Sequence, residues 1–167
     1  SVKTIIAGIG SYGGVRRRFE IKGIAGDVMV VDDYAHHPTE VSATLQAARD
    51  GWDRRIIAVF QPHLFSRTKS FYKEFAAAFM DSDVLIVTDI YPAREKPIKG
   101  VTGKLVSNAA RSTGHKNVHY IPDLENLQVS LDDIIQENDM VITIGAGTIW
   151  RYGQSYFDHL INQEAAA

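Results

Sequence analysis

The chain has 167 residues, of which 45% are hydrophobic and 23% are charged, and it contains no cysteine. This composition is typical of one soluble globular domain, and the lack of cysteine excludes disulfides, thiolate metal sites and cysteine nucleophiles. The net charge of −2 argues against a protein built mainly to bind nucleic acid. No apolar run reaches the roughly 20 residues that span a membrane, so we expect a cytoplasmic domain with no membrane or nucleic-acid partner.

Residues 1–27 contain a glycine-rich turn and a basic cluster instead of a clear helix or strand. Residues 8–13 read GIGSYG and match the G-x-G-x-x-G pattern of turns that bind dinucleotides. Such a turn must lead directly into a helix that holds the pyrophosphate, and residues 14–20 show no helical stripe. We therefore interpret the turn as a hinge or linker. The three arginines at 16–18 are either a solvated run or the source of one side chain that reaches a phosphate.

Five apolar runs predict buried strands, and the segments between them have the spacing of helices. The runs are nearly continuous, which is typical of parallel strands covered on both faces. Strands are expected at residues 28–32, 56–61, 84–89, 118–121 and 140–145. Helices are expected at residues 39–50, 67–80, 103–113, 124–137 and from 148 to about 162. This alternation predicts an α/β fold with a Rossmann-like, doubly wound, mainly parallel sheet of about five to six strands and helices on both faces.

Residues that favour helix ends set the expected boundaries. The sequence Pro-Thr-Glu at 38–40 opens the first helix, and Ser66 is expected to cap the second. Gly114 ends the third helix, and Asp123 opens the fourth. The final EAAA at 164–167 is expected to form a disordered tail.

Polar segments follow the predicted strands at the edge of the sheet where ligands of doubly wound folds bind. They are DDYAHHP at 32–38, QPHLFSRT at 61–68, DIYPARE at 89–95 and GAGT at 145–148. The last of these predicts a tight turn from strand to helix. The loop at 89–96 is consistent either with a structural rim or with a ligand contact.

The segment DDYAHHP suits either a metal or a substrate. A metal site is incomplete, because the adjacent His36 and His37 point to opposite sides of an extended segment and no H-x-x-x-H helix adds ligands. A magnesium ion held mainly by a nucleotide needs few protein oxygens and remains compatible. As a substrate site, Asp33 would accept hydrogen bonds from ribose hydroxyls, while Tyr34 and His36 would donate to a carboxylate or phosphate. We favour the substrate site, with His36 as the ligand and His37 as a packing residue.

The second polar segment contains Arg67, whose planar guanidinium matches a carboxylate and keeps its charge. The alternative is a solvated residue in the first turn of a helix. A cation in that turn opposes the helix dipole, which favours a role other than stability. His63 is equally consistent with a packing residue and with a ligand contact.

The polar segments together resemble the C-terminal domain of the Mur ligases, which build the bacterial peptidoglycan stem peptide, and in particular of their alanine-adding members. The resemblance rests on GVRRRFE, VVDDYAHHPTEV, FQPHLFSRT and TDIYPAREKPIKGV, in this order, and covers residues 14–163. It implies that residues 1–13 are the end of a central ATP-binding domain or a linker. It also implies an N-terminal domain for the UDP-sugar, with ATP and Mg²⁺ held mainly by the central domain.

The reaction implied by the resemblance joins L-alanine to UDP-N-acetylmuramate through an acyl phosphate. Carried over by position, Arg18 would reach the nucleotide phosphates and Asp33 would hold the ATP ribose. Arg18 and His36 are the implied catalytic residues, with His36 as a possible acceptor of the amine proton. The implied substrate-binding residues are Tyr34, His36, His63 and Arg67. No direct metal ligand is implied, and Leu64 stands where some relatives have a further arginine.

Three alternatives remain open from the sequence. The first is a ligase that attaches the recycled tripeptide L-Ala-γ-D-Glu-meso-Dap to UDP-N-acetylmuramate, whose motif tends to carry Phe in place of Tyr34. The second is a stand-alone nucleotide-binding module, and the third is a metal-dependent hydrolase that uses Asp32, Asp33 and His36. The 167 residues are expected to lack ligase activity by themselves.

Overall fold

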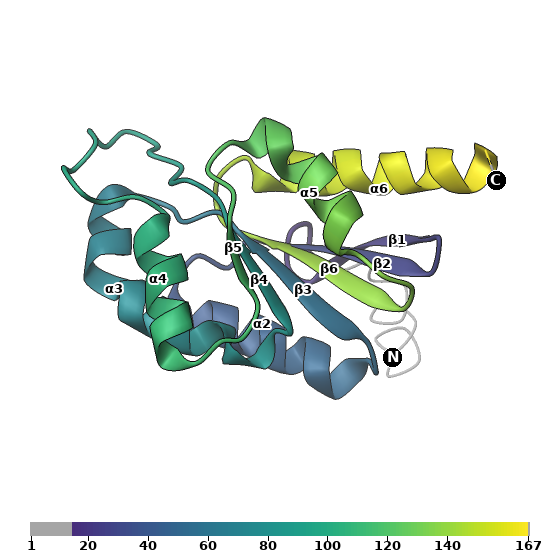
Figure 1. The fold of residues 1–167 in the computed structure, drawn as a ribbon, viewed down its shortest axis with the longest axis horizontal. Coiled ribbons are helices and arrows are strands. Elements are labelled where there is room, and N and C mark those ends of the chain that lie inside the picture. Colours follow the sequence, from purple (N-terminus) through teal and green to yellow (C-terminus); the bar gives the residue numbers. More distant parts are fainter. Residues whose placement is uncertain (1–14, 167) are drawn as a thin grey trace, which may run out of the picture.

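A computed structural model describes residues 15–166 and contains one six-stranded sheet with the strand order β1-β2-β6-β3-β4-β5 (Figure 1). The outer strand β1 is antiparallel to β2, and the remaining strands run parallel. The bounds are Glu20–Ala25 for β1, Val28–Asp33 for β2, Arg55–Phe60 for β3, Val84–Val87 for β4, Val118–Tyr120 for β5 and Asp139–Ile144 for β6. The predicted mainly parallel α/β sheet is thereby confirmed.

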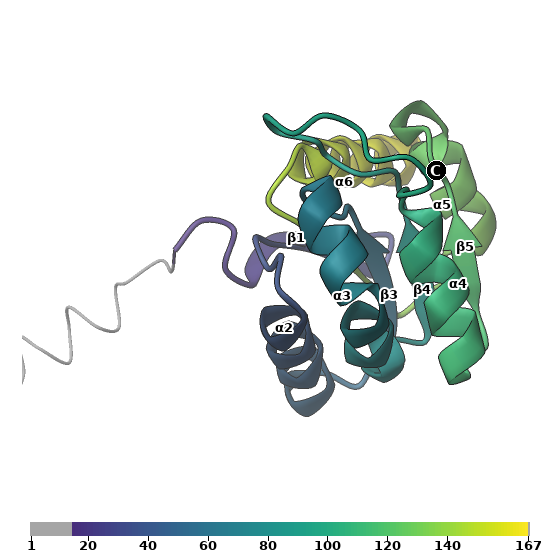
Figure 2. The same ribbon diagram turned by 90° about the vertical axis from the view of Figure 1, so that its left-hand side faces the viewer.

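Helices cover both faces of the sheet (Figures 1 and 2). One face carries α2 (Pro38–Gly51), α3 (Phe65–Ala78) and α4 (Lys104–Thr113), and the other carries α5 (Leu127–Ile134) and α6 (Ile149–Ala166). Two short 3-10 turns, η1 (Phe79–Asp81) and η2 (Leu124–Asn126), adjoin α3 and α5. Because both faces are covered, every residue of β2, β4 and β6 is buried, which explains their continuous apolar sequences.

The strand β1 is absent from the elements predicted from the sequence. It lies at an edge of the sheet, and its residues Ile21 and Ile24 are 46% and 53% exposed. Its register with β2 shifts between Ile21 and Gly23. An added Cβ on Gly23 would lie 2.3 Å from the ring of Phe157, so this glycine lets α6 pack closely against β1.

Two helix boundaries lie where the sequence predicts them, whereas the length of the fourth helix and the C-terminal tail differ from the prediction. Gly114 ends α4 with a φ of 107°, and the side chain of Asp123 accepts the N–H of Glu125 at the start of η2. The fourth helix is shorter than expected, since α5 begins only after η2. The prediction of a disordered tail is wrong for residues 164–166, which are the last residues of α6.

The prediction that Ser66 caps α3 is wrong. The helix begins at Phe65, and the capping position is Leu64, which has a φ of 71° and no side-chain cap. Instead, the Ser66 N–H donates to the Glu95 carboxylate at 2.9 Å, and the Ser66 hydroxyl binds the same carboxylate. A distant acidic side chain therefore occupies the helix N-terminus, where negative charge is favoured.

The parallel strands place the carboxyl ends of β2, β6, β3 and β4 at one edge of the sheet. The polar segments predicted to form a site lie at this edge. The glycine-rich turn at 8–13 falls outside the described residues. Across residues 15–166, no helix is long and apolar enough to span a membrane.

Candidate functional site

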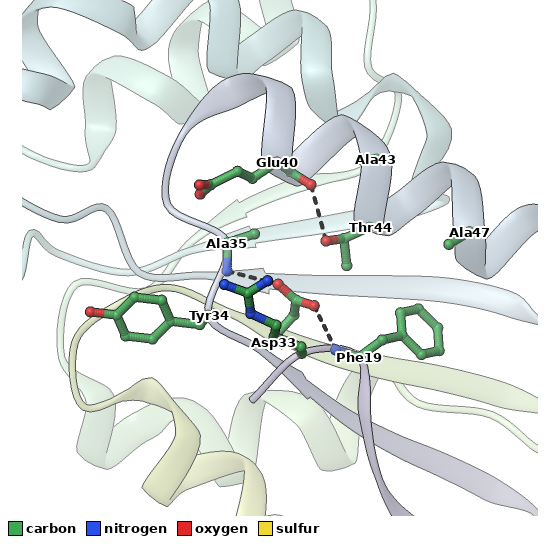
Figure 3. Close-up of a pocket in the computed structure, with 9 residues that line it drawn as sticks. Phe19, Asp33, Tyr34, Ala35, Glu40, Ala43, Thr44 and Ala47 are labelled. Atoms are coloured by element: carbon green, nitrogen blue, oxygen red, sulfur yellow. Dashed lines mark hydrogen bonds between the residues drawn. The ribbon is translucent and has the colours of Figure 1, made fainter. Parts of the chain in front are cut away.

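A cavity of about 420 Å³ opens beside the carboxyl end of β2 (Figure 3). It is bounded by the segment before β1, by the β2–α2 turn and by one face of α2. The lining residues are Arg18, Phe19, Asp33, Tyr34, Ala35, Glu40, Ala43, Thr44 and Ala47. Three residues singled out from the sequence, Arg18, Asp33 and Tyr34, therefore border the same cavity.

The carboxylate of Asp33 is held rigidly at the cavity wall. One oxygen accepts the N–H of Phe19 and the other accepts the N–H of Ala35, both at 2.7 Å (Figure 3). Each carboxylate oxygen has two lone pairs, so one acceptor position on each remains for a ligand. This geometry suits two hydroxyl donors, such as those of a ribose.

The three arginines at 16–18 differ in their surroundings. Arg16 and Arg18 are exposed, and Arg18 borders the cavity. Arg17 instead donates from Nε to the Asp32 carboxylate at 2.9 Å and from Nη2 to the Gly145 carbonyl at 2.5 Å. The cluster is therefore not a uniform solvated run.

Asp32 stabilises the edge of the sheet through its side-chain contacts and does not line the cavity. Its side chain is 1% exposed and accepts hydrogen bonds from Thr143 at 2.8 Å and from Arg17. Burial raises the pKa of the Asp32 carboxyl, while the bonds from Thr143 and Arg17 act in the opposite direction. Within residues 15–166, no group of three or more His, Cys, Asp or Glu side chains is arranged to hold a metal ion.

A second cluster joins the β2–α2 turn to the start of α3. The rings of His36 and His63 lie 5.9 Å apart, and the ring of Tyr34 lies 5.2 Å from that of His36. Arg67 donates from Nη1 to His63 Nδ1 at 3.3 Å and to the His36 carbonyl at 3.4 Å. The four predicted substrate-binding residues are thus brought together.

Hydrogen bonding leaves the Nε and Nη2 groups of Arg67 available. Among residues 15–166, only Nη1 of this guanidinium has hydrogen-bond partners. The Nε and Nη2 donors form the planar edge that binds a carboxylate bidentately. Arg67 can therefore hold a ligand carboxylate without breaking its own contacts.

The two histidines present different groups. A guanidinium only donates, so His63 Nδ1 is an acceptor and the ring proton is on Nε2. Burial lowers the pKa of His63, and the positive charge of Arg67 lowers it further. His36 Nδ1 faces two acceptors, the Tyr34 carbonyl at 3.0 Å and the Glu40 carboxylate at 3.3 Å, and so carries a proton. In the neutral ring, His36 Nε2 is then free to accept one.

Glu40 organises the β2–α2 turn, although it is not among the site residues predicted from the sequence. Its carboxylate accepts the N–H groups of His36 at 2.9 Å and of His37 at 3.1 Å. Burial acts to raise the pKa of the Glu40 carboxyl, but these hydrogen bonds outweigh it and the pKa is lowered. His37 caps α2 and packs against Phe71 with ring centres 5.2 Å apart, as expected of a packing residue. An acidic residue three positions after the cap is the signal that could have identified Glu40.

The loops after β4 and β6 support the cluster. The Tyr91 ring stacks on His63 at 5.9 Å, and the Tyr91 carbonyl accepts the N–H of Leu64. The turn at 145–148 is tight, with the Gly145 N–H bound to the Asp33 carbonyl and the Ile149 N–H bound to the Gln61 side chain. The loop at 89–96 therefore has at least a structural role.

Comparisons with known proteins identify the family of the chain. Residues 17–147 match the family described as Mur ligase, glutamate ligase domain. A UDP-N-acetylmuramate–L-alanine ligase of Salinibacter ruber is 48% identical over the whole chain. The alignment covers 35% of that protein, so the chain spans about a third of the length of the curated relatives it matches.

Solved structures share the fold. A UDP-N-acetylmuramate-alanine ligase from Thermotoga maritima is 25% identical, with a TM-score of 0.74 over 97% of this chain and 36% of its own. A murein peptide ligase from Psychrobacter arcticus gives a TM-score of 0.73 at 23% identity, over 97% of this chain and 33% of its own. A MurF ligase from Thermotoga maritima, solved in complex with ADP, gives 0.62 at 16% identity, over 96% and 36%. Because the family match covers most of the chain, the chain belongs to the Mur ligase family as its glutamate ligase domain.

Proposed function

We propose that residues 14–163 form the C-terminal domain of an ATP-dependent UDP-N-acetylmuramate–L-alanine ligase. The observation that carries the proposal is the adjacency of the Asp33 cavity and the cluster around Arg67. Tyr34 joins them, because it lines the cavity and its ring contacts His36. A nucleotide and an amino acid could thus be held side by side, as the formation of an amide through an acyl phosphate requires.

The proposed reaction has two steps. Transfer of the γ-phosphoryl group of ATP to the lactyl carboxylate of UDP-N-acetylmuramate gives an acyl phosphate and ADP. The amine of L-alanine then attacks the acyl carbon, and phosphate leaves from the tetrahedral intermediate after the amine has lost a proton. We assign the enzyme to the cytoplasm, because the reaction consumes ATP.

On the nucleotide side, Asp33 accepts the ribose hydroxyls at its two remaining acceptor positions. Arg18, at the rim of the same cavity, contacts the phosphates and stabilises charge that develops during phosphoryl transfer. Mg²⁺ supplies further charge neutralisation when bound. We assign the ion and the remaining ATP contacts to a central domain, whose end or linker would be residues 1–13, and the UDP-sugar to an N-terminal domain.

On the acceptor side, Arg67 binds the L-alanine carboxylate through Nε and Nη2. His36 Nε2 accepts the amine proton, consistent with the protonated Nδ1 that faces Tyr34 and Glu40. His63 donates from Nε2 to a carboxylate or acyl oxygen. Arg18 and His36 are therefore the proposed catalytic residues of this domain.

Phosphate release by the full-length protein that contains this chain tests the proposal. We expect release that requires ATP, UDP-N-acetylmuramate and L-alanine together, and a product that contains the amide. Absence of release with L-alanine in a folded full-length protein would refute the assignment.

The tripeptide-adding ligase is the second candidate, because the Psychrobacter murein peptide ligase shares the fold almost as closely as the alanine ligase does. The same assay separates them when L-Ala-γ-D-Glu-meso-Dap replaces L-alanine. Release with the tripeptide but not with L-alanine would select this alternative.

A further inference from the structure

Arg17 connects three parts of the site edge. Its guanidinium donates to Asp32 on β2 and to the carbonyl of Gly145 after β6, and its Cζ lies 4.9 Å from the centre of the Tyr34 ring. Its backbone also takes part, because the Arg17 carbonyl accepts the N–H of Tyr34 at 2.7 Å. One residue therefore holds the segment before β1 against the ends of two strands.

The backbone of this segment is strained. Arg17 has a φ of 59° and Phe19 a φ of 45°, a region that residues with a side chain rarely occupy. Such conformations persist only where surrounding contacts determine them, and they gather at functional sites. The fixed conformation aims the Phe19 N–H at Asp33, where it donates at 2.7 Å.

We propose that Arg17 is a positioning residue for the nucleotide site, which clamps residues 17–19 so that Phe19 orients the Asp33 carboxylate and Arg18 borders the cavity. The inference rests on the proposed function, because it takes the occupant of the cavity to be the nucleotide of that reaction. Arg17 itself does not line the cavity.

The contacts require an arginine. Its two acceptors, the Asp32 carboxylate and the Gly145 carbonyl, lie on different strand ends, and the planar fork reaches both at once. A lysine keeps the charge but lacks the fork and the flat face that packs on Tyr34. Thr143 donates a hydrogen bond to the other oxygen of the Asp32 carboxylate and holds it in place. Asp32 therefore cannot move to meet a shorter side chain at position 17.

The test uses the full-length ligase and two variants. Arg17→Met combined with Asp32→Asn removes the clamp without leaving a buried carboxylate unpaired, whereas Arg17→Lys keeps the charge and removes the fork and the flat face. Arg16→Ala is the matched control, since Arg16 is exposed and its side chain makes no hydrogen bond with residues 15–166. We expect the KM for ATP to rise about 10- to 100-fold in the double variant and less in Arg17→Lys. The KM for L-alanine should change by no more than about twofold. Both KM values of the control should match those of the wild type.

Equilibrium binding of ATP to the same proteins gives a readout that does not depend on turnover. A folded double variant with wild-type ATP affinity would overturn the inference, and so would equal rises in both KM values. If the double variant does not fold, Arg17→Lys decides by the same criteria. A wild-type protein that binds ATP but forms no amide would instead overturn the proposed function, and the ATP affinities would still test the clamp.

Discussion

Replacing Arg67 with alanine should weaken the binding of L-alanine far more than that of ATP. Arg67 lies in the first turn of α3, and its contacts to His63 and His36 leave the Nε and Nη2 edge for a carboxylate. A hydrogen bond to a charged group contributes about 1.5–3 kcal/mol. Loss of that contribution corresponds to a rise of about 10- to 150-fold in the KM for L-alanine.

Initial rates of phosphate release by the full-length enzyme would measure the change, with L-alanine and ATP varied separately. Arg67→Lys should fall between the wild type and Arg67→Ala, because lysine keeps the charge but cannot bind bidentately. Lys69→Ala is the matched control, since Lys69 lies exposed on the same helix. It should leave both KM values unchanged.

Similar increases in both KM values would contradict the reasoning, because Arg67 would then support the site as a whole. An unchanged KM for L-alanine would exclude contact with its carboxylate. Circular dichroism of Arg67→Ala should match the wild type, so that neither result reflects unfolding.

Three further predictions concern stability and the isolated chain. Burial lowers the pKa of His115, whose Nε2 is 3.1 Å from Ser82 Oγ. As the pH falls below about 6.5, the imidazole therefore takes up its proton in the unfolded chain before it does so in the folded chain. Stability should therefore fall with pH below that value, and His115→Gln should flatten the urea-unfolding profile by at most about 1.4 kcal/mol per pH unit; an identical slope would contradict this. Gly103→Ala should lower the free energy of unfolding by about 1–3 kcal/mol, because its Cβ would lie 1.9 Å from the Thr88 carbonyl, whereas Gly51→Ala meets open space and should not destabilise. The 167-residue chain alone should release no phosphate with all three substrates, and release that depends on both UDP-N-acetylmuramate and L-alanine would refute this expectation.

The strands of the sheet centre are predictable because burial on both faces selects continuous apolar sequences. In β6, every residue from Asp139 to Ile144 is buried, and the apolar run marks the strand directly. The edge strand β1 lacks this signal, since its sequence EIKGIA mixes charged, apolar and glycine residues and only Ala25 is buried. Its position depends on contact with β2 and α6, which no local pattern records.

Helix starts are predictable where the cap is local. His37 and Glu40 form a capping box within four residues of sequence at the start of α2. The start of α3 has no local cap, because its N-terminal N–H is bound by Glu95, 29 residues further along the chain. Serine is a residue type that often caps helices, but here the Glu95 carboxylate from another loop binds the N–H at the helix start.

The same distinction applies to the arginines before β1. Residues 16–18 are chemically identical, so the sequence indicates that a cation can reach the strand ends but not which one serves a structural role. The difference arises from partners 15 and 128 residues away, Asp32 and the carbonyl of Gly145, which fix Arg17. With Arg17 anchored, Arg18 is the arginine that borders the cavity. Single replacements of the two should therefore act differently: loss of Arg18 removes a charge from the cavity, whereas loss of Arg17 disturbs the backbone that orients Asp33.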